Sequence, residues 1–254
     1  MYKGFNLSLN SKELSNFQHY YKIGEENYLK LKKPIDNNFR KFLFSPTTID
    51  GTELQENWFP NLNADIFISH SHDDKQLAIA FSGWLYENFG LIAFIDSCLW
   101  GSSDNLLQGV NDNYSVQNLS PKLYSYSDVN YASSHIHMML MNALTMMIDK
   151  CECFIVINTP NSIQKYETLN KSESPWIYNE IALSKFIRIN IPDRFKIIIE
   201  SKTFSAEKDT PQLKINYNLD LDHLTKIDST FLAMWLKKHP TNELEALNYL
   251  YKLK

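Results

Sequence analysis

The chain has 254 residues, of which 44% are hydrophobic, and its net charge at neutral pH is −4. This length can bury one large core or two smaller ones, so it leaves the number of domains open. Lys and Arg number 25 against 29 Asp and Glu, which leaves no basic excess to neutralise a phosphate backbone. The charge balance therefore disfavours nucleic acid as a partner.

The sequence shows neither a membrane-spanning segment nor a secretory signal. No apolar run approaches the roughly 18 residues that a membrane span needs, and residues 1–10 lack a charged-then-apolar signal pattern. We therefore expect a cytoplasmic protein without a membrane partner. The three cysteines are Cys98, Cys151 and Cys153, and the last two would share one face of a strand, so we expect no disulfide framework.

The clearest structural signal is a strand, a helix and a second strand in close succession. The apolar run 65–68 ends in the polar cluster 69–74, which is typical of a buried strand that meets a loop. Helical spacing of apolar residues then begins at Leu77, an aspartate of the cluster can cap this helix, and Gly90 can end it. Residues 91–95 form a second apolar run, which predicts a parallel pair with a right-handed crossover.

The same alternation of helices and strands continues along the chain. It predicts a helix over 136–148 capped by Ser133 or Ser134, a strand over 153–157, a helix from Ser174 to about residue 187, and a strand over 195–199. Helices that alternate with apolar strands predict an α/β fold with a doubly wound parallel sheet.

Three regions fall outside this rhythm. Residues 1–60 show no clear period, although residues 42–44 could pad the sheet edge as a strand, and residues 101–132 are long enough to suggest a lid or binding loop. After residue 200, a polar connection leads to short helices over 230–238 and 242–251. We therefore expect an N-terminal extension (1–60), a central domain (61–200) and a mostly helical C-terminal extension (201–254).

In an open parallel sheet, ligands bind beyond the carboxyl ends of the strands. Residues 69–74, 96–101 and 158–161 should meet at that edge. No glycine-rich phosphate loop accompanies them, which disfavours a Rossmann dehydrogenase or a P-loop nucleotidase. In the helix that begins near Ser174, Trp176 and Glu180 are four residues apart and share one face.

Two interpretations of this pair are open. In the structural one, Trp176 packs in the core and Glu180 is a solvated helix residue. The functional one is favoured by the position beside the ligand-binding edge, and because Glu180 lies too far into the helix to act as a first-turn partner of the helix dipole.

Four motifs follow one another along the chain, namely Asp65 to Asp74 (DIFISHSHDD), Phe94 to Ser97 (FIDS), Phe154 to Ser162 (FIVINTPNS) and Ser174 to Glu180 (SPWIYNE). In their order and spacing they resemble the motifs of TIR (Toll/interleukin-1 receptor) domains. The resemblance covers about residues 61–200 and implies a flavodoxin-like TIR fold. Bacterial and plant TIR domains with this glutamate commonly cleave NAD⁺, whereas animal receptor and adaptor TIR domains are mostly scaffolds.

The resemblance also implies roles for individual residues. Glu180 matches the catalytic glutamate, and Trp176 matches the tryptophan one helical turn earlier. The substrate-binding residues that we expect beside Trp176 are Ser69, His70 and Ser71 after the first strand, Asp96 at the start of the BB loop, and Trp100. NAD⁺ would be the substrate, and we expect no further cofactor and no metal.

The proposed chemistry suits these residue types. Nicotinamide is a cationic leaving group, so its bond to ribose breaks with little acid assistance through an oxocarbenium-like state. An ionised Glu180 would bind the ribose hydroxyls and stabilise the developing positive charge. Water, the adenine of the same molecule or another nucleophile would then give ADP-ribose, a cyclic isomer or a conjugate, and the sequence does not choose among these.

The resemblance further implies a place in antiphage immunity, as in Thoeris-type systems. There, a TIR protein makes an ADP-ribose-derived signal that acts on a separate effector protein. We therefore expect a homo-oligomer on activation and a phage-derived activator.

Two other functions remain open. The first is a non-enzymatic TIR scaffold that assembles through TIR–TIR contacts. The second is a metal-dependent hydrolase that uses His70, His72 and Asp74, although Lys75 stands where that motif continues with a histidine.

Overall fold

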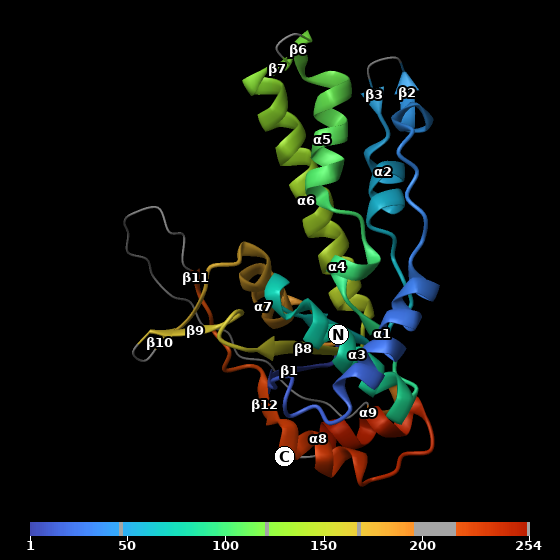
Figure 1. The fold of residues 1–254 in the computed structure, drawn as a ribbon, viewed down its shortest axis with the longest axis vertical. Coiled ribbons are helices and arrows are strands. Elements are labelled where there is room, and N and C mark those ends of the chain that lie inside the picture. The colour runs from blue at the N-terminus through green and yellow to red at the C-terminus, as the bar shows by residue number, and fades with distance from the viewer. Residues whose placement is uncertain (46–47, 120–121, 167–168, 196–216, 253–254) are drawn as a thin grey trace.

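The computed structural model describes residues 1–45, 48–119, 122–166, 169–195 and 217–252. Its central sheet has five strands, all parallel, in the order β12-β1-β8-β4-β5. The strands are β1 (Lys3–Ser8), β4 (Ile66–Ser69), β5 (Ala93–Phe94), β8 (Cys153–Asn158) and β12 (Thr225–Asp228). Helices flank this sheet, so the predicted α/β class with a doubly wound parallel sheet is confirmed (Figure 1).

The middle of the sheet is apolar on both faces. β4 pairs with β8 from Ile66 against Cys153 to Ser69 against Val156, and all four β4 residues are buried. This continuous burial is the pattern expected of a parallel strand with helices on both sides. The order β5-β4-β8 places the first predicted strand between the second and the third, as in flavodoxin-like sheets.

Helices cover the two faces of the sheet. The first layer contains α3 (Lys75–Phe89), α8 (Ser229–Leu236) and α9 (Glu243–Lys252), and the ring of Trp235 lies 4.1 Å from Phe89. α1 (Phe17–Leu31) packs along α3. α6 (Tyr126–Lys150) and α7 (Pro175–Phe186) contact each other on the opposite side of the strands, as Figure 1 shows.

Helix ends follow the predicted capping residues in most cases. Gly90 ends α3 with a φ of 73°, in the left-handed region that glycine adopts without strain. The Ser174 side chain accepts a hydrogen bond from the Ile177 amide, and Pro175 is the first residue of α7. α8 and α9 confirm the two predicted C-terminal helices to within two residues at each end.

The predicted start of the 136–148 helix is wrong. α6 begins at Tyr126, and its N-cap is Ser125, whose side chain accepts a hydrogen bond from the Asp128 amide. The Ser134 hydroxyl instead donates to the Asn130 carbonyl inside the helix. The first turns of α6 are mostly exposed, so they lack the apolar repeat that the prediction relied on.

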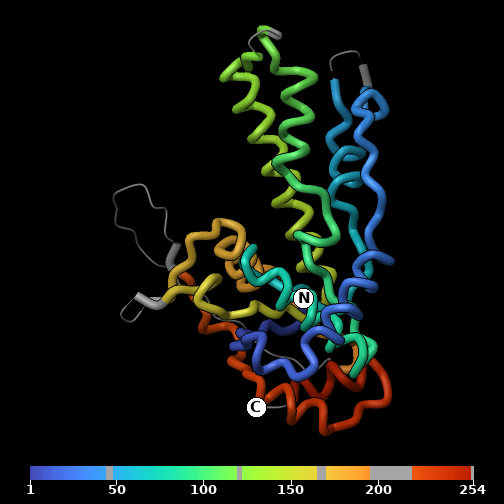
Figure 2. The backbone as a smooth tube through the Cα atoms, viewed as in Figure 1, coloured from blue at the N-terminus to red at the C-terminus, as the bar shows by residue number. Residues whose placement is uncertain are grey.

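The prediction of an irregular loop over 101–132 is also wrong, because helices and strands make up most of this region. It contains the connection that follows α4 (Asp96–Leu99), then α5 (Ser103–Tyr114), the hairpin strands β6 (Val116–Leu119) and β7 (Lys122–Tyr124), and the start of α6. α5 packs on α6, and together they form an arm that projects from the body (Figures 1 and 2).

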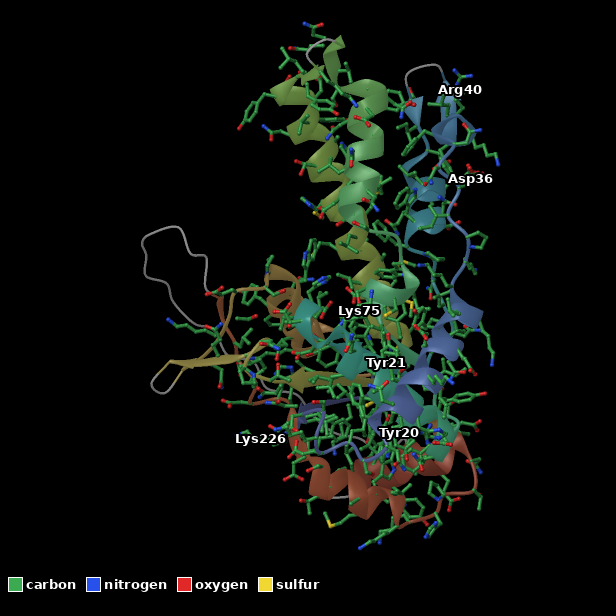
Figure 3. All side chains as sticks on the ribbon, viewed as in Figure 1. Tyr20, Tyr21, Asp36, Arg40, Lys75 and Lys226 are labelled. Carbon is green, nitrogen blue, oxygen red and sulfur yellow. The ribbon has the colours of Figure 1, made fainter. Side chains whose placement is uncertain are left out.

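A second chain segment runs along this arm. It contains the 3-10 helix η1 (Phe39–Phe42), the strands β2 (Leu43–Ser45) and β3 (Thr48–Ile49), and α2 (Gly51–Trp58), which contacts α6. The prediction that residues 42–44 pad the sheet edge is therefore wrong, since β2 pairs with β3 in a two-stranded hairpin. Figure 3 places Asp36 and Arg40 along the arm, and Lys75 where the arm meets the body.

The central sheet takes strands from outside residues 61–200. β1 lies between β8 and β12, and six of its residues pair with β8. The predicted strand over 195–199 falls mostly outside the described residues, and Phe195 ends a 3-10 helix, η3 (Asp193–Phe195). β1 therefore occupies the place beside β8 where a flavodoxin-like order puts its fourth strand.

The remaining short elements lie around the carboxyl edge of the sheet. They are η2 (His72–Asp74), α4 (Asp96–Leu99), and a small antiparallel sheet of β9 (Gln164–Tyr166), β10 (Leu169–Ser172) and β11 (Tyr217–Asn218). Within the described part of the chain, no helix combines the length and the apolar character that crossing a membrane requires.

Candidate functional site

The predicted site segments follow three neighbouring parallel strands. β4 ends at Ser69, β5 leads into Asp96 at the start of α4, and β8 leads into Thr159. Because these strands are adjacent and parallel, their carboxyl ends lie at one edge of the sheet. The α7 helix passes beside this edge (Figure 1).

Glu180 lies at this edge and is buried. Its side chain is 3% exposed, and the Ser69 hydroxyl donates a hydrogen bond of 2.6 Å to Glu180 Oε2. Ser69 itself is fully enclosed at the last position of β4. The interpretation of Glu180 as a solvated helix residue is therefore wrong, and the acid is aimed at the end of the strand.

Burial controls the charge of Glu180. Removal from water raises its pKa well above the ordinary value, the negative charge of Asp96 raises it further, and the hydrogen bond from Ser69 lowers it. The neutral acid is thus favoured in this closed arrangement. The sequence led us to expect an ionised carboxylate, and the difference arises because the pattern could not show that the side chain leaves solvent.

A second polar group gathers at the start of α4. His70 Nε2 lies 3.1 Å from the Ser97 hydroxyl, and Lys75 Nζ donates to the Ser97 carbonyl at 3.1 Å. Asp96 Oδ1 accepts the Ser97 amide at 2.6 Å. Burial lowers the pKa of His70 while the charge of Asp96 opposes this, so the neutral imidazole is favoured.

A third set of contacts joins the loops that follow β4 and β8. The buried Asp74 carboxylate accepts hydrogen bonds from the Thr159 hydroxyl and from Asn161 Nδ2. The sequence predicted that residues 69–74 and 158–161 meet at this edge, and these hydrogen bonds confirm it. The pattern did not show which side chains make the contact, and we gave Thr159 and Asn161 no role in the site.

The remaining predicted site residues have other neighbours. The Ser71 hydroxyl accepts the Asp73 amide and caps η2. The ring of Trp176 is half-buried and lies 5.9 Å from that of His137 on α6. Trp100 is buried, and its indole donates to the Pro60 carbonyl at 2.9 Å. The structure therefore brings together Ser69, His70, Asp96 and Glu180, and it places Trp100 in the core.

The histidines that suggested a metal site do not converge. His70 faces Ser97, His72 is exposed, and Asp74 binds Thr159 and Asn161. Among the residues that the structure describes, no three His, Cys, Asp or Glu side chains are grouped so that they could hold a metal ion.

No protein-family model, curated protein or solved structure matches this chain. A functional assignment therefore rests on the sequence motifs and on the geometry at the edge of the sheet.

Proposed function

We propose that this chain cleaves the bond between nicotinamide and ribose in NAD⁺, with Glu180 as the catalytic residue. The observation that carries the proposal is the burial of Glu180 against Ser69, at the carboxyl end of a central parallel strand. Buried acids with shifted pKa values at such edges are typical of active sites. The TIR-like motif that contains Trp176 and Glu180 supplies the substrate class.

The raised pKa of Glu180 suits a cationic substrate. A nearby positive charge favours the ionised carboxylate, so binding of the pyridinium ring of NAD⁺ would lower the pKa of Glu180, which would then release its proton to water. The bond to ribose then breaks, nicotinamide leaves with the bonding electrons as a neutral molecule, and the positive charge moves to the ribose. A carboxylate in a dry site stabilises that charge more strongly than it stabilises the bound substrate.

Access to Glu180 requires a change of conformation, since its side chain is only 3% exposed. We propose that self-association or a phage-derived activator shifts α7 relative to the β4 end and opens the site. The product would be an ADP-ribose derivative that signals to a separate effector protein. The arrangement with Glu180 buried would then be the resting state, in which NAD⁺ is not cleaved.

The test is nicotinamide release from NAD⁺, followed by mass spectrometry, with and without candidate activators. We expect Glu180→Gln to reduce the rate by at least about 100-fold. Glu173→Gln is the matched control because this acid is exposed and lies just before α7. Equal rates for wild type and Glu180→Gln would remove Glu180 from the mechanism, and equal losses in both variants would point to a nonspecific effect.

Assembly through the arm is a second candidate function. Large apolar side chains are unusually exposed there, namely Leu123 (53%), Tyr126 (83%), Tyr131 (69%) and Met138 (58%). Their exposure favours a scaffold in which the arm mediates self-association. Light scattering of wild type and a Tyr126→Ser/Tyr131→Ser double variant tests this role. Loss of the oligomers in the variant would support assembly through the arm, and oligomers of unchanged size would exclude it.

A further inference from the structure

A polar cavity of about 160 Å³ lies at the carboxyl edge of the sheet, beside the ends of β1 and β8. Its lining residues come from β1, β8, β10, β12 and the turn before β12, and they are Asn6, Ser8, Asn158, Asn170, Leu221 and Lys226. Val156 of β8 pairs with Ser69 on one side and with Asn6 on the other, so β8 separates this cavity from Ser69. None of the residues gathered around Glu180 lines it.

The cavity contains a buried amide with unused donors. Asn6 lies in the middle of β1, between the fully buried Phe5 and Leu7, and is only 5% exposed. Its Oδ1 accepts a hydrogen bond of 2.9 Å from Asn158 Nδ2, while its own Nδ2 has no acceptor among the described residues. Burying an amide without an acceptor destabilises a fold, so core packing does not explain an asparagine at this position. A polar residue that breaks the apolar pattern of a central strand is typical of a functional site.

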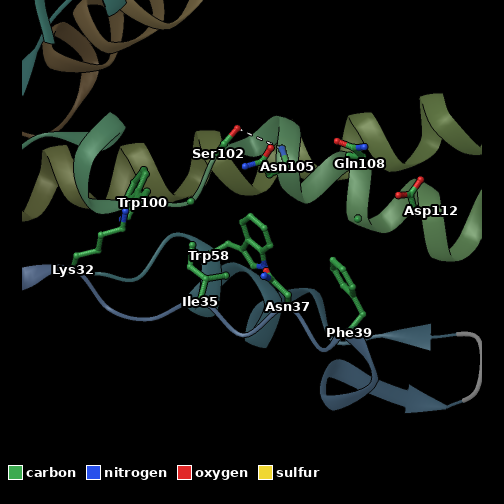
Figure 4. Close-up of a pocket in the computed structure, with 12 residues that line it drawn as sticks. Lys32, Ile35, Asn37, Phe39, Trp58, Trp100, Ser102, Asn105, Gln108 and Asp112 are labelled. Carbon is green, nitrogen blue, oxygen red and sulfur yellow. Dashed lines mark hydrogen bonds between the residues drawn. The ribbon is translucent and has the colours of Figure 1, made fainter. Parts of the chain in front are cut away.

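The Nδ2 atom of Asn6 is open to the cavity. A larger cavity of about 520 Å³ at the base of the arm, shown in Figure 4, differs in this respect. There the Trp58 indole N–H also lacks a partner among the described residues, but it is closed off, and the rings of Trp58 and Phe39 pack against Gly101 and Gly109. An atom of a ligand can therefore reach the Asn6 donor, whereas it cannot reach the Trp58 donor.

The register of the sheet gathers the polar side chains on one face. Asn6 pairs with Lys226 of β12, and Ser8 pairs with Asn158, the last residue of β8. Residues that pair across parallel strands project from the same face, and so do residues two apart in one strand. These four side chains therefore share a face, and Asn170 of β10 adds a further amide. The position beyond the carboxyl ends of parallel strands is where open α/β sheets bind ligands.

The lining selects the charge of the ligand. It offers three side-chain amides, the hydroxyl of Ser8 and the ammonium of Lys226, which Figure 3 places on the β12 side of the body. Lys226 makes no ion pair with any described residue. The described lining residues include no carboxylate, which a metal ion or an amine would need, and no aromatic ring on which a base could stack. This set fits a small oxyanion, because several neutral donors and one cation can share its charge.

We propose that this cavity binds a phosphate group, either as inorganic phosphate or as the monoester of a small polyol. The amides of Asn6 and Asn170 donate to the phosphate oxygens, and the Lys226 ammonium balances their charge. The cavity volume of about 160 Å³ is roughly five times the ~30 Å³ that one water molecule occupies, so it admits a phosphate with a few further atoms. This function is separate from NAD⁺ cleavage at Glu180 and does not depend on it.

The test follows the side-chain amide resonances of Asn6 by NMR in the full ¹⁵N-labelled chain, assigned through Asn6→Asp. The titrants are inorganic phosphate, glycerol 3-phosphate and uncharged glycerol, at an ionic strength held constant with sodium chloride. We expect the phosphates to shift the Asn6 resonances in a saturable way, and the tighter of the two identifies the form of the ligand. No shift with either phosphate at up to ~20 mM, or an equal shift with glycerol, would overturn the proposal.

Variants test the two kinds of contact. Asn6→Asp places a negative charge in the cavity and should weaken phosphate binding at least about tenfold, whereas Asn16→Asp adds the same charge at an exposed position and should not. Lys226→Ala should weaken binding about fivefold. Lys237→Ala removes the same charge from the exposed end of α8 and should leave the affinity unchanged. Equal affinities of wild type and Lys226→Ala would overturn the proposal, and this pair of lysine variants decides alone if Asn6→Asp does not fold.

The experiment also distinguishes this cavity from the proposed active site. The backbone amides of Ser8 and Asn158 report binding in the variants, and the Trp235 indole resonance reports folding, because its N–H is hydrogen-bonded in the core. Glu180→Gln should bind phosphate as wild type does, whether or not NAD⁺ cleavage is observed. Shifts confined to the amides next to Glu180 would place the phosphate there and overturn the assignment to the cavity beside Asn6.

Discussion

Ser69 and Glu180 are 111 residues apart in the chain, yet the hydroxyl of one lies 2.6 Å from the carboxyl oxygen of the other. Their hydrogen bond joins the end of a central strand to the second turn of α7. Both side chains are almost fully enclosed. A change at either residue should therefore affect stability as well as any chemistry at this edge.

Glu180→Gln should stabilise the protein at neutral and alkaline pH. Burial raises the pKa of Glu180 above its value in the unfolded chain, so the folded state holds the proton more tightly. The corresponding stability is full below the unfolded pKa of about 4.3 and is lost as pH rises through the folded pKa. Glutamine resembles the neutral acid and can still accept from Ser69, so this loss should disappear.

Urea unfolding at pH 5 and pH 8 measures this effect. We expect the wild type to lose more stability than Glu180→Gln between these values, with a difference of roughly 1–3 kcal/mol. Subtracting the two curves cancels other titrating groups such as Asp65, whose pKa is also raised by burial. Parallel curves would mean that Glu180 is solvated and ionised at pH 8.

Ser69→Ala should shift the pH dependence of NAD⁺ cleavage to higher pH. The hydrogen bond from Ser69 lowers the pKa of Glu180, so its removal raises that pKa further and delays ionisation. The measurement is kcat/KM for nicotinamide release across the pH range. Ser71→Ala is the control, because Ser71 caps η2 and should alter stability without moving the profile. An unshifted profile in Ser69→Ala would separate the hydroxyl from the titrating group.

Asp74→Ala should destabilise the fold by about 1–3 kcal/mol. The substitution leaves the buried Thr159 hydroxyl and the Asn161 amide without their acceptor and releases the loop after β8 from the loop after β4. Asp73→Ala is the matched control, since Asp73 is exposed and should change the free energy of unfolding by less than about 0.5 kcal/mol. Equal effects in a denaturant titration would contradict the structural role of Asp74.

The three thiols should be unreactive in the native protein. Cys98, Cys151 and Cys153 are all free and buried. Burial raises the pKa of each thiol, and that of Cys151 to about 12, so the thiolate that attacks a disulfide reagent is scarce. Titration with a chromogenic disulfide at pH 8 should detect no rapid thiol in the native state and all three in denaturant. Fast reaction of one native thiol would show that its strand or helix opens.

Gly83→Ala should destabilise the protein by about 1–3 kcal/mol or more. A Cβ at Gly83 would overlap the Tyr20 carbonyl oxygen and the Gly24 amide nitrogen of α1, and backbone atoms cannot move aside as a side chain can. Gly51→Ala makes a useful contrast. A Cβ there meets only the flexible end of Met139 at 3.2 Å, so the helix propensity of alanine should raise stability by up to ~0.5–1 kcal/mol. Thermal unfolding of both variants tests the two opposite signs.

The sequence alone predicted the features that depend on neighbouring residues. The apolar runs became β4 and β8, Gly90 ended α3, and Ser174 with Pro175 began α7. Each of these signals is local, because capping, turn formation and the burial of a short run depend on residues only a few positions apart. The sequence also predicted that the segments after β4, β5 and β8 meet, because the carboxyl ends of parallel strands lie at one edge of a sheet.

Only the tertiary structure decided which distant segments complete the sheet and what surrounds the acid. The sequence of β1 shows no clear period and did not predict a strand, yet β1 pairs with β8 and β12, which begin about 150 and 220 residues later. The sequence placed Glu180 on a helix face beside Trp176, but its burial, its bond to Ser69 and its raised pKa depend on how α7 packs over the end of β4. The pairing of parallel strands and the desolvation of Glu180 both depend on residues far away in the chain, so the periodic pattern of neighbouring residues cannot predict them.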